Sequence, residues 1–233
     1  MKNLLLLSSS RENQSGYLEH ALEMITEHLG GIAELLFVPY AGVSISYDTY
    51  TDMVQTALSP LGIKVTGIHT CSNPKQAINN AKAIAVGGGN TFHLLHQLQE
   101  NGLIEIIQEN VEQGMPYIGW SAGSNVAGLS IRTTNDMPII EPKTFKALSL
   151  VEFQLNPHYT DYNPPGHNGE TREQRLNEFM VINPEMPIVA IVEGTALKRT
   201  GDKLQLIGPS QGYLFKNGNK SDLLENADLS YLL

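Results

Sequence analysis

Short apolar runs alternate with amphipathic stretches through the first half of this 233-residue chain. The runs occupy residues 4–7, 35–38, 65–68, 83–86 and 117–119, and each is bounded by Gly, Pro, Ser or Asn. None alternates cleanly between apolar and polar residues, which is typical of strands buried on both faces of a parallel sheet. The stretches between them carry apolar residues at helical spacing and end near Gly. This rhythm predicts an α/β fold with a mostly parallel, doubly wound sheet, flanking helices and right-handed crossovers.

The pattern changes after Ser130. Several later segments resemble strands at a sheet edge or in a small antiparallel layer: 137–140, 148–155, 195–200, 204–207 and 213–215. A helix over 172–181 and a buried strand over 188–192 interrupt them. The chain has no linker, low-complexity tract or internal repeat. We therefore expect a single catalytic domain over residues 1–233, with a small additional β layer in its C-terminal half.

Charge and cysteine content exclude several classes of partner. The formal net charge is −9 and the acidic residues are spread along the chain, so the surface repels nucleic acid and anionic membranes. Cys71 is the only cysteine, which excludes an intrachain disulfide and fits a reducing compartment. The apolar run at residues 4–7 is shorter than the ~7–15 residues of a signal peptide. No segment approaches the ~20 apolar residues of a membrane span, so we expect a cytoplasmic protein.

A G-x-S-x-G motif at residues 119–123 places Ser121 between an apolar strand and an expected helix. Glycine on both sides relieves the strained backbone of such a turn, which projects the serine hydroxyl above the carboxyl edge of the sheet. The helix dipole and free N–H groups stabilise an oxyanion at this point. The alternative is a chance motif in a chain with 21 glycines. The strand–turn–helix context favours a nucleophile.

A second glycine-rich turn follows the strand at 83–86 and contains Gly88, Gly89 and Asn90. A dinucleotide loop is disfavoured because Phe92 replaces the third glycine of that motif and no P-loop lysine follows. The strand before this turn should lie beside the strand before Ser121, so the turn suits the second half of an oxyanion hole. A tight turn leading to a helix N-cap at Thr91 is the alternative.

A serine nucleophile needs a base and an acid that orients the base. His158 follows the expected strand 148–155, and a buried structural histidine is its alternative role. Glu193 directly follows the apolar strand 188–192, and capping of the next turn is its alternative role. His93 and His96 lie one turn apart on a helix, but no nearby Cys, Asp or Glu completes a metal site, so we expect no metal.

At these positions the sequence resembles peptidase E, the family of α-aspartyl dipeptidases, whose relatives share the fold of class I glutamine amidotransferases. The similar segments are residues 87–91, 117–123, 131–139, 156–158, 166–175 and 193–194. They extend over most of the chain. The order Ser, His, acid also differs from the Ser, acid, His order of α/β-hydrolases.

The resemblance implies a Ser-His-Glu triad with Ser121 as nucleophile, His158 as general base and Glu193 as orienting acid. It implies hydrolysis of dipeptides that carry an N-terminal aspartate, without a metal or organic cofactor. The oxyanion donors would be the N–H groups of Ala122 and of Gly88 or Gly89. Asn90, in the same glycine-rich turn, is a candidate substrate contact.

Arg172 lies in the expected capping box at 171–174, in a helical first turn where the macrodipole disfavours a cation. A guanidinium held there could clamp the aspartate carboxylate of the substrate. The alternative is a solvated arginine paired with Glu170 or Glu173. Glu170 is itself a candidate partner for the free ammonium of the substrate.

Two other functions compete with an aspartyl dipeptidase. One is a hydrolase of β-aspartyl links similar to cyanophycinase, which shares a Ser-Ala-Gly turn. The other is a catalytically silent ligand-binding domain on the same fold. The sequence leaves the choice between monomer and homodimer open.

Overall fold

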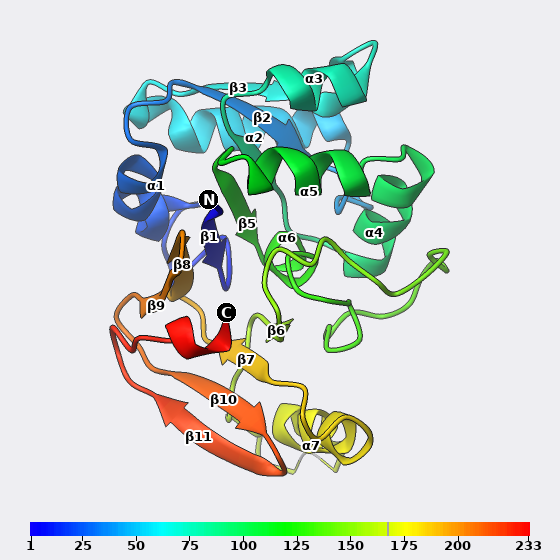
Figure 1. The fold of residues 1–233 in the computed structure, drawn as a ribbon, viewed down its shortest axis with the longest axis vertical. Coiled ribbons are helices and arrows are strands. Elements are labelled where there is room, and N and C mark those ends of the chain that lie inside the picture. Colours follow the sequence, from blue (N-terminus) through cyan, green and yellow to red (C-terminus); the bar gives the residue numbers. More distant parts are fainter. Residues whose placement is uncertain (167) are drawn as a thin grey trace.

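The computed structural model describes residues 1–166 and 168–233, and its centre is a large, mostly parallel β-sheet (Figure 1). The strands lie in the order β3-β2-β4-β5-β1-β8-β9. Their bounds are β1 Asn3–Leu7, β2 Glu34–Val38, β3 Lys64–Gly67, β4 Ile84–Val86, β5 Tyr117–Trp120, β8 Ala196–Thr200 and β9 Lys203–Ile207. Strands β1 to β5 pair in parallel, whereas β8 runs antiparallel to both β1 and β9. The predicted α/β fold is confirmed.

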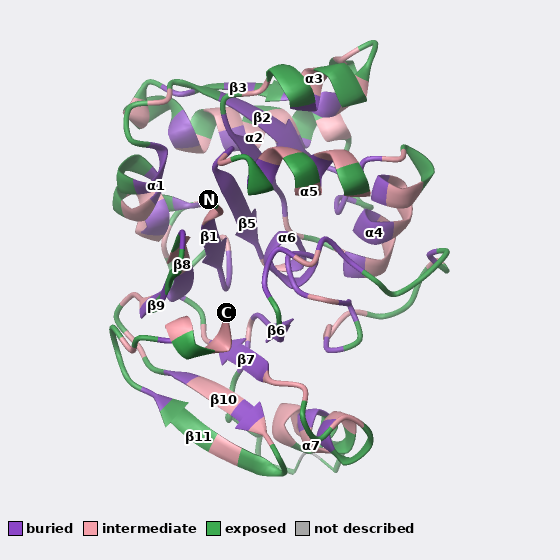
Figure 2. Ribbon diagram, in the orientation of Figure 1, coloured by how far each residue is buried: buried purple, intermediate pink, exposed green. Residues whose placement is uncertain are grey.

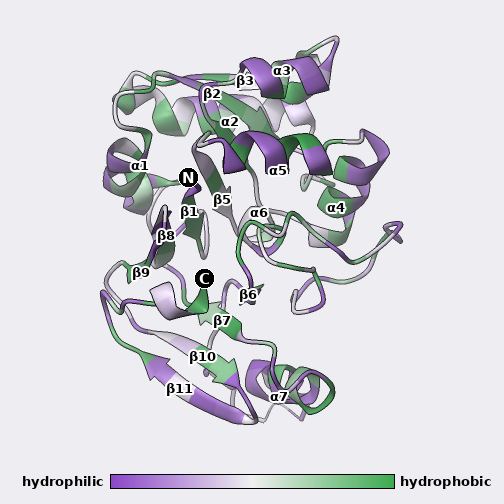
Figure 3. Ribbon diagram, in the orientation of Figure 1, coloured by the Kyte–Doolittle hydropathy of each residue, from purple (hydrophilic) through white to green (hydrophobic). Residues whose placement is uncertain are grey.

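Helices cover both faces of this sheet because successive strand residues point to opposite sides. Leu5 and Leu7 pack in one core with α1 and α2, whereas Leu4 and Leu6 pack in a second core with α3 to α6. The bounds are α1 Leu22–Leu29, α2 Tyr47–Leu58, α3 Pro74–Asn80, α4 Thr91–Glu100, α5 Ile104–Glu112 and α6 Ala122–Asn125. Figures 2 and 3 show the buried, largely apolar strands between these layers. Within the described residues, no helix combines the length and the apolar character needed to cross a membrane.

A second, smaller sheet lies beside the large one, at the lower end of Figure 1. Its strand order is β11-β10-β7-β6. The bounds are β6 Gln154–Asn156, β7 Ile188–Ile191, β10 Gly212–Lys216 and β11 Asn219–Leu223. One face packs against Leu176 and Met180 of helix α7 Arg172–Ile182, and the other joins a core of the large sheet through Val189 and Ile191. The additional β layer expected in the C-terminal half is confirmed.

Two of the expected strands are wrong. Residues 137–140 form no strand, and of residues 148–155 only the last two belong to β6. Residues 148–153 instead wrap around the end of the short helix α6. The N–H of Leu148, for example, donates to the carbonyl oxygen of Val126 at 2.8 Å. The apolar side chains are therefore buried, but the backbone is satisfied by a helix end rather than by a neighbouring strand. Nothing in the sequence pattern predicts α3 or β11.

His28 is expected to make the stability of this fold sensitive to pH. It lies on α1 and only 5% of its surface is exposed. Burial lowers its pKa from 6.5 to about 4, and the nearby Lys198 ammonium acts in the same direction. Between these pH values the unfolded chain binds a proton that the folded chain does not, so stability falls as the pH falls. The loss from this residue should reach about 3 kcal/mol.

Replacement of His28 by phenylalanine is expected to remove this contribution. Urea unfolding at about pH 7 and about pH 4.5 should show a drop in the free energy of unfolding that is roughly 2–3 kcal/mol smaller in His28→Phe than in the parent protein. His96→Gln on α4 is the matched control and should keep the parent drop. An unchanged drop in His28→Phe would show that His28 does not control the acid sensitivity.

Candidate active site

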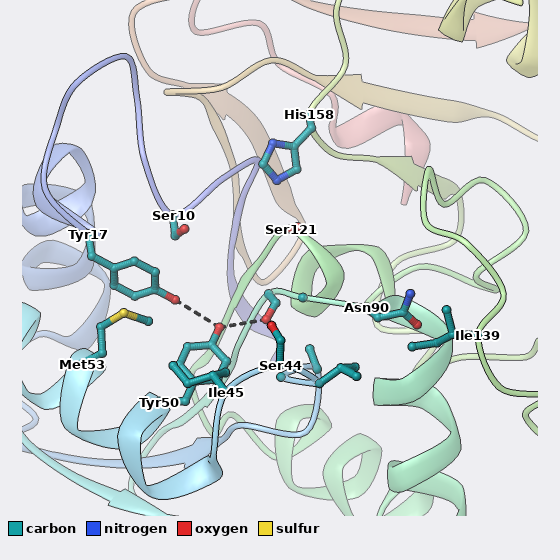
Figure 4. A pocket seen from close by; sticks show the side chains of 15 residues that line it. Ser10, Tyr17, Ser44, Ile45, Tyr50, Met53, Asn90, Ser121, Ile139 and His158 are labelled. Atoms are coloured by element: carbon teal, nitrogen blue, oxygen red, sulfur yellow. Dashed lines mark hydrogen bonds between the residues drawn. The ribbon is translucent and has the colours of Figure 1, made fainter.

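Ser121 occupies the turn between β5 and α6, at the carboxyl end of a central strand (Figure 4). Its backbone angles, φ 54° and ψ −116°, are uncommon for a residue with a side chain. Gly119 and Gly123 permit this turn, because a Cβ on Gly123 would overlap the Val86 carbonyl and a Cβ on Gly119 would overlap the backbone of Gly123. The structure therefore places Ser121 on a strained strand-to-helix turn, as the sequence indicates.

His158 and Glu193 reach the same region from the small sheet. Each stands two residues beyond a strand, His158 after β6 and Glu193 after β7, and these two strands are parallel neighbours whose carboxyl ends meet. His158 Nδ1 lies 2.7 Å from Glu193 Oε1. A proton on Nδ1, donated to this carboxylate, leaves Nε2 free to accept a proton from another group.

Ser8 links the large sheet to the small one beside His158. It follows β1 and is fully buried, and its Oγ donates to the carbonyl oxygen of Ile191 at 2.8 Å. The same Oγ accepts the backbone N–H of His158 at 2.9 Å. His158 has a φ of 55°, so this hydrogen bond helps to hold an uncommon backbone conformation. One signal in the sequence pointed to Ser8: like Ser121, it directly follows a buried strand.

Ser121 and His158 line the same two pockets. One has a volume of about 470 Å³ and is drawn in Figure 4, and the other has a volume of about 220 Å³. Among the described residues, the Ser121 hydroxyl has no hydrogen-bond partner. Such catalytic hydrogen bonds often tighten only when substrate binds. Ser121, His158 and the space for a ligand are thus adjacent.

The turn after β4 lies against Ser121. Strands β4 and β5 are parallel neighbours, with Val86 opposite Gly119. Gly88 is so close to Ser121 that a Cβ on Gly88 would crowd the serine Cβ, and Gly89 has a φ of 139° that requires glycine. Within the described part of the chain, the N–H groups of Gly88, Gly89 and Ala122 donate to no protein acceptor. The backbone around Ser121 thus offers unused donors.

The smaller pocket has Arg172 on one side. Arg172 is the first residue of α7, and the predicted capping box between Thr171 and Gln174 is present, with bonds of 2.8 and 3.2 Å. Burial lowers the pKa of the Arg172 guanidinium, and Arg175 acts in the same direction. An arginine nevertheless stays charged at neutral pH, so the pocket carries a half-buried cation.

The two acidic residues that the sequence offered as partners of Arg172 are engaged elsewhere. Glu170 Oε2 lies 3.6 Å from Arg175 Nε, and Glu173 Oε2 lies 3.0 Å from Lys220 Nζ. Among the described residues, Arg172 forms no salt bridge. The guanidinium is therefore available to an anionic ligand.

Asp136 provides a carboxylate in the same pocket. Its Oδ2 accepts the N–H of Thr91 at 2.7 Å and the hydroxyl of Thr91 at 2.6 Å, which fixes the side chain at the start of α4. Asp136 also favours the charged form of Arg172. The pocket therefore presents both signs of charge beside Ser121. The sequence carried one signal for Asp136, its place within residues 131–139, which resemble peptidase E.

The positions of two expected substrate-binding residues, Glu170 and Asn90, give less support to that role. Glu170 is exposed and, of the pockets described around Ser121, lines neither. Asn90 lines the larger pocket, but its amide is engaged: Oδ1 accepts the N–H of His93 at 3.0 Å and Nδ2 donates to the carbonyl oxygen of Met137 at 2.9 Å. Asn90, and not Thr91, is the N-cap of α4.

Comparison with known proteins identifies the family to which this chain belongs. The model of peptidase family S51 matches residues 4–207. The chain belongs to peptidase family S51. It is 56% identical over 230 residues to peptidase E of Shewanella amazonensis, covering 98% of each chain. It is 57% identical over 232 residues to peptidase E of Shewanella baltica strain OS155, covering 99% of this chain and 98% of the relative.

A solved structure supports the fold independently. The crystal structure of a peptidase from an acI-B1 actinobacterium superposes with a TM-score of 0.69 at 18% identity, over 98% of this chain and 96% of the other. The match to the family model and the two relatives named peptidase E confirm the resemblance noted in the sequence. Membership of family S51 assigns the chain to the peptidases.

Proposed function

We propose that this S51 peptidase is a serine exopeptidase that hydrolyses dipeptides with an N-terminal aspartate. The observation that carries the proposal is Arg172, a half-buried guanidinium without a salt bridge among the described residues, in the same pocket as Ser121 and His158. A cation in this place favours a substrate that brings its own carboxylate close to the scissile bond.

The chemistry follows from the positions of three residues. Ser121 Oγ attacks the aspartyl carbonyl carbon while His158 Nε2 accepts the hydroxyl proton. Glu193, 2.7 Å from Nδ1, keeps the imidazole in the required tautomer and stabilises the imidazolium. The imidazolium then protonates the departing amine, and the peptide C–N bond breaks to leave an aspartyl ester on Ser121. A water molecule, deprotonated by His158, releases aspartate and restores the serine.

The negative charge that develops on the carbonyl oxygen needs donors. The N–H of Ala122 stands at the start of α6, immediately after the nucleophile, where the helix dipole also favours an anion. A glycine N–H of the turn after β4 completes the pair. Both donors are backbone groups, so no side chain donates directly to the oxyanion.

Opposite charges in the smaller pocket fit an N-terminal aspartate. Arg172 would bind the side-chain carboxylate, in a charge-assisted pair. Asp136 would accept the free ammonium through the oxygen that Thr91 does not occupy. Recognition of this ammonium would restrict cleavage to the first residue of the chain, as in an exopeptidase.

The larger pocket would take the leaving residue. Apolar and aromatic side chains line it, among them Tyr17, Ile45, Tyr50, Met53 and Ile139, and of the described residues no Lys, Arg, Asp or Glu does so. A charged side chain of the leaving residue would find no oppositely charged side chain among these lining residues. We therefore expect leaving residues with uncharged side chains.

A dipeptide panel tests this function. Asp-Leu should be cleaved, whereas Asn-Leu and Ala-Leu should have kcat/KM values lower by about 50-fold or more, because they offer no carboxylate to Arg172. Asp-Glu and Asp-Lys should be poorer than Asp-Leu. The panel includes β-aspartyl-arginine. Preferential cleavage of this compound would replace the proposal with a β-aspartyl hydrolase, and equal cleavage of Asp-Leu and Ala-Leu would exclude aspartate recognition.

A further inference from the structure

Three aromatic side chains form a hydrogen-bonded chain that ends on the carbonyl oxygen of Gly88. Trp120 Nε1 donates to Tyr17 OH at 2.9 Å and approaches Tyr50 OH at 3.2 Å. Tyr17 OH donates to Tyr50 OH at 3.1 Å, and Tyr50 OH donates to Gly88 O at 2.9 Å. Figure 4 shows the last two of these bonds on the wall of the larger pocket.

The direction of donation in this chain is fixed by its two ends. An indole N–H can only donate and a carbonyl oxygen can only accept. Burial raises the pKa of the hydroxyls of Tyr17 and Tyr50, so both stay protonated at neutral pH. The Tyr50 proton is therefore available to Gly88 O.

Packing holds the Tyr50 ring in place. Phe37 stacks on Trp120 with a centroid separation of 5.7 Å, and it meets Tyr50 edge-on at 5.0 Å. Gly87 leaves room for the ring, because a Cβ there would crowd the Tyr50 hydroxyl and Phe37. Only 3% of Tyr50 is exposed. The hydroxyl is thus a fixed donor rather than a mobile one.

Among the residues that the structure describes, only Tyr50 donates a hydrogen bond to the carbonyl of this peptide unit. Two backbone hydrogen bonds hold the ends of the turn after β4. Gly87 N–H donates to Val38 O at 3.1 Å, and Asn90 N–H donates to Ala41 O at 2.9 Å. The peptide that joins Gly88 to Gly89 lies between these two hydrogen bonds. Its orientation has little intrinsic preference because both flanking residues are glycines. Within the described structure, the bond from Tyr50 is the one hydrogen bond made by its carbonyl.

We propose that Tyr50 is a positioning residue of the oxyanion hole. A trans peptide is planar, so its carbonyl and N–H point in opposite directions. By holding the Gly88 carbonyl, Tyr50 fixes the Gly89 N–H on the other side, where it donates to the oxyanion together with Ala122. This inference rests on the proposed function and selects Gly89 over Gly88 as the glycine donor.

Tyr50→Phe tests the inference because it removes the hydroxyl and keeps the ring. Loss of a whole oxyanion donor lowers kcat about 10²–10³-fold, so a misoriented donor should lower kcat on Asp-Leu by about 10- to 100-fold. KM should stay within about 3-fold of the parent value, because the oxyanion forms only in the transition state. Tyr47→Phe, on the same helix one turn earlier, is the matched control and should keep the parent kcat.

A second measurement separates positioning from a general loss of structure. An aspartyl boronic acid mimics the tetrahedral intermediate, whereas free aspartate resembles the ground state. Tyr50→Phe should weaken binding of the boronic acid by the same factor as kcat/KM and leave binding of aspartate unchanged. Tyr50→4-aminophenylalanine returns a hydrogen-bond donor to the same place and should recover most of the activity. This variant keeps the inference testable if Tyr50→Phe folds poorly.

The outcomes distinguish this inference from the proposed function. If Ser121→Ala is inactive but Tyr50→Phe keeps a kcat within about 2-fold of the parent, only the role of Tyr50 is wrong. Equal weakening of boronic acid and aspartate would also overturn it, because that pattern indicates a distorted pocket. If Ser121→Ala retains full activity, the proposed function itself fails.

Discussion

Ser121→Ala is expected to lower kcat on Asp-Leu by about 10⁴-fold or more. The variant keeps the pocket, Arg172 and the backbone donors, but it lacks the proposed nucleophile that would form the aspartyl ester. Substrate affinity should change little, since the hydroxyl contributes mainly to the chemical step. Single-turnover kinetics with Asp-Leu measures the loss, and isothermal titration with the variant measures the affinity.

Ser124→Ala is the matched control for this experiment. Ser124 lies three residues further on, is fully buried, and donates to the carbonyl oxygen of Leu7 at 2.6 Å. Its removal should cost about 1–3 kcal/mol of stability because Leu7 O loses its donor, and activity should remain. A Ser121/His158 double variant should be no worse than either single variant, since the two residues act as one unit. Additive losses would contradict a shared catalytic step.

The features that the sequence predicted well are those encoded locally. Strands buried on both faces lack alternation, so the parallel strands of the large sheet were recognisable. The turn at Ser121 was visible because only glycine fits on either side of it. The capping box beside Arg172 was visible for a similar reason, since its two hydrogen bonds join residues three apart.

The features that the sequence did not predict depend on contacts between distant segments. The apolar side chains of residues 148–153 are buried where the segment covers the end of α6, and apolar content alone cannot distinguish this from a strand. The hydrogen bond between His158 and Ser8 joins residues 150 positions apart. Tyr50 meets Gly88 across 38 positions, and Asp136 meets Thr91 across 45. Spacing in the sequence carries no signal for such pairs.

Arg172→Ala should lower kcat/KM on Asp-Leu by about 10²–10³-fold and leave the slow cleavage of Ala-Leu within about 3-fold of the parent value. Truncation would remove the proposed charge-assisted pair and leave the substrate carboxylate half-buried beside Asp136, which would repel it. Removing one partner of such a pair costs about 2–4 kcal/mol, and most of this cost is the unpaired charge that remains. The loss should therefore depend on the substrate carrying a carboxylate.

Two further substitutions make the comparison specific. Arg172→Lys keeps the charge but loses the planar, two-pronged donor, so its loss on Asp-Leu should be intermediate, about 10-fold. Arg175→Ala, one turn further along α7, removes an exposed arginine paired with Glu170 and should change kcat/KM by less than about 2-fold. The ratio of kcat/KM for Asp-Leu to that for Ala-Leu is the measurement that decides. If Arg172→Ala lowers kcat/KM equally for Asp-Leu and for Ala-Leu, Arg172 supports the structure of the pocket but does not bind the substrate carboxylate. Aspartate specificity would then require another residue.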